Sequence, residues 1–363
     1  MAANLKVSAA MPRGYLGPTP RPPRLNDESY QSFVEGLRGF SGIKMSLSAM
    51  LALHSALRLP PVPVPRIDRR QLRAAGDAQP TLATRNRFLR SSQEMMWRNL
   101  NESFGTRRAA IEASLLDAEQ RGPGSLEWSA NFAIPEYTQR DFHVQPGGYQ
   151  RDALTGPVYH YGTKVFFVGT NDQDEMHDEV VASCPLPAAG ELTKILDIGC
   201  SIGQSATALK KRYPQAQVTA IDIAAPLLRY GHWRATQLGS EVHFKQRCAE
   251  QTGFADNSFD MVHSTILFHE VPFAKTCEIV REALRVLRPG GVFNVVDFPS
   301  GEPIPAGLQY FLDIDHQFNG EPYSLEFVYA DFTGELERAG FKVTRGPMVA
   351  RYLRSWFCVK PSP

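Results

Sequence analysis

The sequence predicts an α/β protein in which a doubly wound, mainly parallel sheet follows a mainly helical N-terminal region. Beyond Leu192, short and continuous apolar runs alternate with helical segments. Strands are apolar on both sides when helices cover both faces of a parallel sheet, so this texture favours βαβ units. The second observation is the run "ILDIGCSIGQSATALKKRYP", where an apolar strand enters a glycine turn and a helix follows.

Length and composition limit what the chain can be. Its 363 residues exceed one ordinary domain of roughly 100–200 residues, so we expect one α/β domain with an N-terminal addition. With 43% hydrophobic and 21% charged residues the chain can bury a full core. The 39 Lys and Arg against 38 Asp and Glu leave a net charge of +1. This balance provides no basic field, and we expect no nucleic-acid partner.

The cysteines and the apolar runs indicate the compartment. Five scattered cysteines, with no C-x-x-C pair and an odd total, argue against a disulfide framework and a structural zinc site. A reducing compartment, the cytoplasm, is therefore predicted. The longest candidate apolar run, "MSLSAMLALHSALRLP", falls short of the ~18–20 residues that span a bilayer, so no membrane insertion is expected.

The chain before the α/β texture divides into a tail and helical segments. Residues 1–27 are rich in Pro and Gly and are predicted to be a disordered tail; organelle targeting is the alternative interpretation. Helical spacing runs from Glu28 to about Leu59 and again from about Leu82 to Glu119, and "LPPVPVPR" breaks the first stretch. We expect residues 28–187 to form a mainly helical region with an aromatic segment that closes over a site.

The strands are expected at the continuous apolar runs in the second half of the chain. These runs are "KILDIG", "QVTAIDI", "EVHFKQ", "FDMVHSTI", "VFNVVDF", "FKVTRG" and "SWFCVK". The first of them ends in the glycine turn, where Gly199 and Gly203 let the backbone pass close to a ligand. Free amides at the N-terminus of the following helix then offer donors to a polar group.

Two carboxylates sharpen the interpretation of this turn. Asp197 precedes Gly199 by two residues, where it can organise the loop and reach a cationic amino group. Asp222 ends the second strand, where a carboxylate accepts hydrogen bonds from both hydroxyls of a ribose. A turn of this kind also occurs in nicotinamide and flavin enzymes, and a simple strand-turn-helix joint is the structural alternative.

With these motifs the sequence resembles the class I S-adenosylmethionine-dependent methyltransferases, in particular the small-molecule branch with the ubiquinone/menaquinone-biosynthesis C-methyltransferases. The resemblance covers about residues 190–298. It implies a Rossmann-like sheet with a C-terminal antiparallel strand, and a cofactor-binding catalytic domain over residues 188–363. In that family the Asp-x-Gly-x-Gly-x-Gly loop cradles the methionine part of the cofactor, which corresponds here to Asp197, Gly199, Cys200, Ser201 and Gly203. Ser201 replaces the middle glycine, so its φ is predicted not to be positive.

The resemblance assigns further contacts to the cofactor. It implies that Asp222 binds the ribose and that Ile223 packs on the adenine. Cys248 stands where an aspartate often accepts from the adenine amino group, so adenine recognition is expected to use the backbone amide of Ala249 as well. In "ALRVLRPGGVFNVVDF", Pro289 is expected to stop a helix and the two glycines after it to form a turn.

The acceptor side is expected at the end of the fourth strand, "STILFHEVP". His269 and Glu270 lie there, and a histidine near the transferred methyl could take a proton from the acceptor. The alternative is that His269 caps a helix or shapes the pocket. The segment has no Asn/Asp-Pro-Pro-Tyr/Phe motif of the kind that N-methyltransferases of nucleic acids carry.

Two aromatic segments are candidates for the acceptor pocket. Residues 300–329 hold several aromatics that form either a small-molecule pocket or ordinary core. The motif "DIDHQ" suggests metal ligands, but no third and fourth ligand follow at convincing spacing, so no metal is predicted. Tyr149, Tyr159 and Tyr161 are placed either to close a lid over the cofactor or to pack in the core.

The resemblance therefore implies an enzyme that methylates a small metabolite on oxygen, carbon, nitrogen or sulfur with S-adenosylmethionine. A cofactor-binding partner subunit without catalysis and an NAD-dependent oxidoreductase are the two alternatives. The helices between Glu28 and Leu59 carry more apolar residues than a lone surface helix needs. We expect a homodimer through them, with residues 28–187 controlling acceptor binding.

Overall fold

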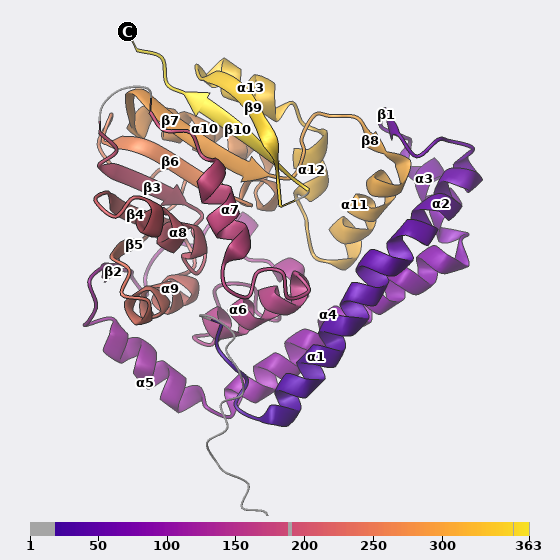
Figure 1. Cartoon of the computed structure of the whole chain (residues 1–363), viewed down its shortest axis with the longest axis horizontal. Helices are drawn as coiled ribbons and strands as arrows, with labels where there is room; N and C mark the ends of the chain where they lie inside the picture. Colours follow the sequence, from indigo (N-terminus) through magenta and orange to yellow (C-terminus); the bar gives the residue numbers. More distant parts are fainter. Residues whose placement is uncertain (1–18, 188–190, 351, 363) are drawn as a thin grey trace, which may run out of the picture.

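The computed structural model describes residues 19–187, 191–350 and 352–362, and a central sheet organises them (Figure 1). The sheet has eight strands in the order β2-β5-β4-β3-β6-β7-β10-β9. Its parallel central strands are β5 (Val242–Gln246), β4 (Gln217–Asp222), β3 (Lys194–Ile198), β6 (Phe259–Thr265) and β7 (Leu287–Asp297). At the far edge β10 (Leu353–Val359) runs antiparallel to both β7 and β9 (Lys342–Val349). The predicted doubly wound sheet with a C-terminal antiparallel strand is confirmed.

Helices cover both faces of this sheet. α8 (Gln204–Arg212) and α9 (Ala225–Gln237) share one apolar cluster, which includes Ile195 of β3. α10 (Phe273–Val286) and α13 (Phe332–Ala339) share another, which includes the next residue, Leu196. Because neighbouring strand residues point to opposite faces, each needs to be apolar. This double burial explains the continuous apolar runs. α10 ends at Val286, three residues before Pro289, so the Arg-Pro-Gly-Gly segment opens β7 instead of ending the helix.

The region before residue 188 contributes directly to the layers of the α/β domain. Strand β2 (Ser125–Glu127), which the sequence did not predict, pairs in parallel with β5 at the sheet edge. α7 (Glu175–Ser183) packs beside α8. Elements before residue 188 thus pack in and beside the sheet. The domain boundary at residue 188 stays a prediction.

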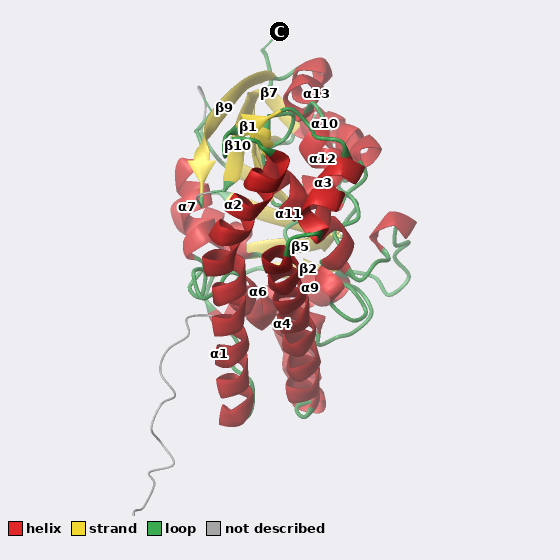
Figure 2. Cartoon of the chain, turned by 90° about the vertical axis from the view of Figure 1, so that its right-hand side faces the viewer, coloured by secondary structure: helices red, strands yellow, loops and turns green. Residues whose placement is uncertain are grey.

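Long helices form a wall on one side of the molecule (Figures 1 and 2). α1 (Leu25–Gly39), a π-helical turn (Phe40–Lys44) and α2 (Met45–Leu57) make one rod, which packs against α4 (Pro80–Gly105). α1 begins at Leu25, inside the predicted tail of residues 1–27, of which residues 1–18 lie outside the described part. α4 ends at Gly105 and α5 (Arg108–Ala118) follows it, so the second predicted helical stretch consists of two helices.

The remaining elements connect this wall to the sheet. α3 (Arg69–Asp77) and α6 (Thr155–Phe166) pack on α4, and β1 (Pro63–Val64) pairs with β8 (Ile304–Pro305). The predicted insertion of residues 300–329 holds α11 (Ala306–Phe318), packed on α2, and α12 (Ser324–Tyr329). Its Tyr310 and Phe311 are core residues against α2 to α4. Within the described ranges, none of the helices is both long and apolar enough to cross a bilayer.

Candidate functional site

A cavity of about 930 Å³ opens at the carboxyl ends of the central strands. Its floor includes Asp197 of β3 and Asp222 of β4, and the residues after β6 border it as well. The N-terminal region supplies an opposite wall with Trp97, Phe142 and Phe166. Ligands in open α/β sheets bind at this edge, and a mainly apolar cavity of this size suits small molecules.

The glycine loop forms the floor of the cavity through left-handed backbone. Gly199 has φ +67°, and a Cβ there would lie 2.8 Å from Leu267. Gly203 has φ +74°, and a Cβ there would lie 2.6 Å from the Phe244 ring. Ser201, between them, has φ +49°, so the prediction that its φ is not positive was wrong. Its amide donates to Asp222 Oδ2 at 2.9 Å, and this bond holds the strained turn.

Asp222 ties the loop to the second strand. Its Oδ2 accepts from the Ser201 amide and its Oδ1 from the Ala224 amide, both at 2.9 Å. Burial raises the pKa of the Asp222 carboxyl against the effect of these hydrogen bonds. Each carboxylate oxygen has a second lone pair, so Asp222 can accept from ribose hydroxyls while it keeps the loop in place.

Asp197 is a buried acid with an unused oxygen. Asp197 is 1% exposed, and its Oδ2 has no hydrogen-bond partner among the described residues. Burial, and then the charge of Asp222, raise the pKa of this carboxyl well above its usual range. A cation in the cavity would offset both effects, which agrees with the expected contact to a cationic amino group.

Some of the other predicted cofactor residues line the cavity and some do not. Cys200, Ile223 and Ala249 line the cavity, whereas Gly203 supports the loop from behind. Cys248 lies in a neighbouring surface pocket instead. Arg247 and Glu250, which flank the predicted adenine residues, line the main cavity, and the sequence analysis had missed both.

His269 is buried and paired. It sits in the short 3₁₀ turn Phe268–Glu270 after β6, and its Nδ1 lies 2.7 Å from Asp297 Oδ1 at the end of β7. Burial lowers the pKa of His269, but the charge and hydrogen bond of Asp297 outweigh it and raise that pKa to about 9. Since Nδ1 is held, Nε2 is the nitrogen left for a ligand, and His269 lines the cavity.

Asp297 was missed, although a signal existed. It is the last residue of β7 and lies in the run "VFNVVDF". The parallel pairing of β6 with β7 therefore places it beside the residues after β6. It also accepts from the Phe268 amide at 2.7 Å, which fixes the turn that carries His269. The ring is thus held in a turn and also lines the cavity, and the role of general base stays a prediction.

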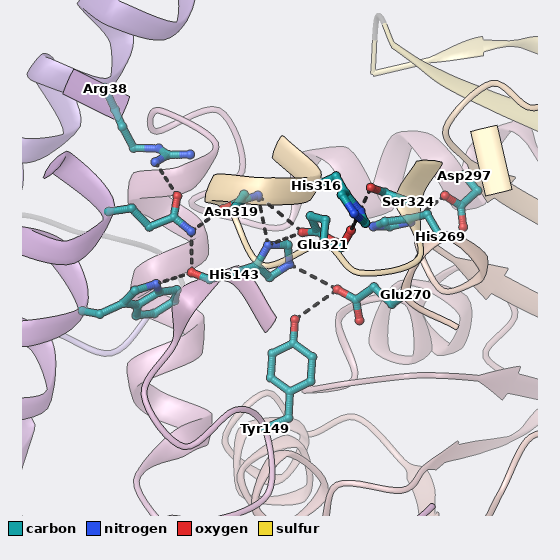
Figure 3. Close-up of polar contacts among 12 residues, drawn as sticks. Arg38, His143, Tyr149, His269, Glu270, Asp297, His316, Asn319, Glu321 and Ser324 are labelled. Carbon is teal, nitrogen blue, oxygen red and sulfur yellow. Dashed lines mark hydrogen bonds and ion pairs between the residues drawn. The ribbon is translucent and has the colours of Figure 1, made fainter. Parts of the chain in front are cut away.

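Glu270 belongs to a second cluster on the same wall (Figure 3). Its Oε1 accepts from the Tyr149 hydroxyl at 3.0 Å and lies 3.1 Å from His143 Nε2. His143 Nδ1 lies 2.6 Å from Glu321 Oε1. Burial lowers the pKa of His143, but the two carboxylates raise it to about 10. The sequence analysis named neither His143 nor Glu321.

The predicted lid tyrosines fall into two groups. Tyr149 and Tyr159 line the cavity and their rings meet edge to face at 5.6 Å between centroids. Tyr161 packs in the apolar cluster of α1, α4 and α6 instead. Tyr149 also stacks on Phe142 at 5.5 Å, so this part of the cavity wall is a connected aromatic layer.

Comparisons with known proteins find similarity to methyltransferases. A family profile described as "Methyltransferase domain" matches residues 195–291. The chain is 38% identical to a demethylmenaquinone methyltransferase of Thermus thermophilus over 117 residues, which are 32% of this chain and 52% of that enzyme. The chain therefore spans about half the length of that relative. It is 30% identical to an uncharacterized methyltransferase of Synechocystis over 43% of this chain and 70% of that protein.

The chain belongs to the class I S-adenosylmethionine-dependent methyltransferases. This membership rests on the sequence matches that cover the cofactor loop and the strands around it. A solved S-adenosylmethionine-dependent methyltransferase from Aquifex aeolicus overlaps with a TM-score of 0.39 at 21% identity, over 51% of this chain and 89% of that one.

The described residues of the methyltransferase fit S-adenosylmethionine. The unpartnered buried oxygen of Asp197 suits the amino group of the cofactor, and the loop at Gly199 has no room for a side chain. Asp222 is free to accept from a ribose on its remaining lone pairs. Both acids favour a ligand that carries positive charge, as this cofactor does on its sulfonium and ammonium groups.

We predict that Asp222→Ala weakens binding of S-adenosylhomocysteine about 10- to 150-fold, the equivalent of roughly 1.5–3 kcal/mol of charge-assisted hydrogen bonding. The change removes a ribose acceptor and releases the Ser201 amide. Isothermal titration calorimetry measures it, with NAD expected to give no heat. Asp256→Ala, at an exposed turn outside the cavity, is the control and should bind normally. An unchanged dissociation constant for Asp222→Ala would remove this residue from the site.

Proposed function

We propose that the methyltransferase methylates a small-molecule acceptor held in the aromatic part of the cavity. The observation that carries this proposal is that one continuous cavity joins the glycine loop to His269 and the aromatic wall. The names of two relatives give small-molecule substrates for those proteins, demethylmenaquinone and 27-O-demethylrifamycin SV. Transfer to oxygen, carbon, nitrogen or sulfur is compatible with this arrangement.

The chain's own residues act by positioning and by proton transfer. S-adenosylmethionine supplies the activated methyl group. Asp197, Gly199, Cys200 and Ser201 would bind its methionine part, and Asp222, Ile223 and Ala249 its adenosine part. We leave Cys248 out of this set, because it does not line the cavity. The aromatic wall excludes water from the space in which the acceptor would lie.

His269 is the proposed general base. Asp297 holds Nδ1, which orients Nε2 towards the cavity and stabilises the imidazolium that forms when a proton is taken from the acceptor. A cationic cofactor in the same cavity would oppose protonation of His269 and so favour its basic form. Glu270 is proposed to act beside it, through Tyr149 and His143.

The two alternatives each lack support in this site. A cofactor-binding subunit without catalysis would not need a buried Asp–His pair at the cavity wall. An NAD-dependent oxidoreductase would share the ribose carboxylate, but the family match concerns methyltransferases. We further propose a cytoplasmic location, since the five cysteines are free.

Transfer itself is tested by incubating purified protein with methyl-labelled S-adenosylmethionine and a metabolite extract. We expect one or a few labelled products of low mass, identified by mass spectrometry. His269→Gln is expected to retain cofactor binding and to lose most of the label transfer. Label found only on protein or nucleic acid would contradict the proposal, and so would cofactor binding with no transfer to any fraction.

The pH dependence tests the role of His269. Because its pKa is raised to about 9, the ring is protonated at neutral pH and becomes a base only as the pH rises. We expect kcat/KM for the acceptor to rise with pH, with its midpoint near pH 9 and a plateau above it. Asp297→Asn should move this limb towards about 6.5, the ordinary histidine pKa, while it lowers the plateau. A profile that is flat, or that is the same in Asp297→Asn, would contradict the assignment.

We also propose that the protein is a homodimer and that residues 28–187 govern acceptor binding. Exposed apolar side chains follow one face of the α1–α2 rod at helical spacing: Phe33, Phe40, Ile43, Leu47 and Leu51. Ile43 also borders the cavity, so a second copy on this face would cover its rim. In a two-fold interface the same surface of both copies packs together, and an apolar stripe of this kind could pack against its counterpart in a second copy.

We expect the wild-type protein to have twice its chain mass of 40.4 kDa by light scattering. Leu47→Glu places a charge in the stripe and should give a folded monomer, because an unpaired charge cannot be buried at an interface. Leu116→Glu is the matched control: Leu116 is equally exposed, on α5 away from the stripe, and its variant should remain a dimer. A monomeric wild type would rule the dimer out.

A further inference from the structure

We propose that His143, Glu270 and Glu321 bind a divalent metal ion at the acceptor end of the cavity. One ligand atom of each lies within 4.8 Å of the other two, and all three residues line the cavity (Figure 3). No metal was predicted from the sequence, because no third and fourth ligand follow "DIDHQ" at convincing spacing. The three residues proposed here are far apart in the chain. They come from the turn Phe142–Val144, the turn after β6 and the loop between α11 and α12.

One pair of these atoms has the spacing that a small octahedral ion requires. Two ligands at right angles, each about 2.1 Å from the ion, are about 3 Å apart. His143 Nε2 and Glu270 Oε1 are 3.1 Å apart, so one ion can bind both with little movement. Glu321 Oε2 is buried and has no hydrogen-bond partner among the described residues. To bind the ion, Glu321 would have to release His143 Nδ1 and turn this oxygen towards Nε2.

The backbone brings these segments into close contact. Gly320 precedes Glu321 with φ +69°, and a Cβ there would lie 2.8 Å from the Asp141 carbonyl oxygen and 3.2 Å from the Val144 amide. Only glycine lets the loop approach the turn of His143 so closely. His143 itself has φ +52° and Val144 has φ +58°, so the turn that carries the ligand is held in an unfavourable conformation.

An outer layer of hydrogen bonds orients the three ligands. The carbonyl of His143 accepts from Trp97 Nε1 at 2.8 Å and from the Gln93 amide, and Gln93 in turn accepts from Arg38. Tyr149 donates to Glu270 at 3.0 Å. The Glu321 carbonyl lies 2.8 Å from His316 Nδ1 and accepts from the Ser324 hydroxyl. Metal ligands in proteins are oriented by such second contacts.

The ligand set indicates the class of ion. One imidazole with two carboxylates suits Mn²⁺, Fe²⁺ or Zn²⁺ better than Mg²⁺ or Ca²⁺, which prefer oxygen alone. Three protein ligands leave positions open towards the cavity. This role rests on the proposed function. An acceptor with an oxygen donor would bind the ion at these open positions. The ion would position the acceptor and lower the pKa of its oxygen group, so that His269 can take the proton.

Metal binding can be measured without any turnover. Metal-stripped full-length protein is titrated with Mn²⁺ and with Zn²⁺ by calorimetry, and S-adenosylhomocysteine binding is measured in parallel. We expect one saturable site per chain, weaker binding of Mg²⁺, and a nitrogen coupling from imidazole in the pulsed electron paramagnetic resonance spectrum of the Mn²⁺ form. His143→Gln and Glu321→Gln should each weaken the metal at least about tenfold and keep S-adenosylhomocysteine binding.

Glu326→Gln is the matched control, since Glu326 is an exposed glutamate in α12, five residues after Glu321. It should bind metal like the wild type. The proposal is overturned if the wild type shows no saturable site, if the Mn²⁺ spectrum has no nitrogen coupling, or if both ligand variants bind metal normally. Loss of S-adenosylhomocysteine binding in the wild type would instead refute the proposed function. If one ligand variant does not fold, the wild-type spectrum and the other variant decide.

Discussion

Parallel pairing of the central strands is the constraint on which the site depends. Ile198 of β3 pairs with Ile221 of β4, and Thr265 of β6 pairs with Val296 of β7. This register brings the carboxyl ends of all four strands to one edge. The acids that end the strands therefore meet there, and each loop that follows starts from a fixed point. The glycine turn, the His269 turn and the cavity between them are consequences of this register.

Features that depend on neighbouring residues could be predicted from the sequence. Continuous apolar runs indicated the strands, because burial on both faces requires apolar residues along the whole strand. The glycine turn indicated the positions of Asp197 and Asp222, because strand ends and helix starts are local. The steric rule failed at Ser201, where a hydrogen bond from its amide to Asp222 stabilises a positive φ that the side chain alone disfavours.

Features that depend on distant contacts were not predicted. Strand β2 is three residues long and forms only because β5 offers it an open edge. The aromatics Tyr310 and Phe311 could have lined a pocket or a core, and packing on α2 to α4 made them core. His143 and Glu321 become neighbours only when the N-terminal region folds over the sheet, and no spacing in the sequence records that contact.

Charge divides the cavity into two ends with different chemistry. At the floor, Asp197 and Asp222 are buried with pKa values raised mainly by burial, and no cationic side chain is bonded to either carboxylate in the described part of the chain. That end gains most from a bound cation. At the wall, His269 and His143 each have carboxylate partners, and their pKa values are raised. That end sets the two imidazoles against three carboxylates, Asp297, Glu270 and Glu321, and can hold or release a proton. In the proposed reaction, a cationic cofactor on the floor would therefore favour the deprotonated, basic form of the imidazole at the wall.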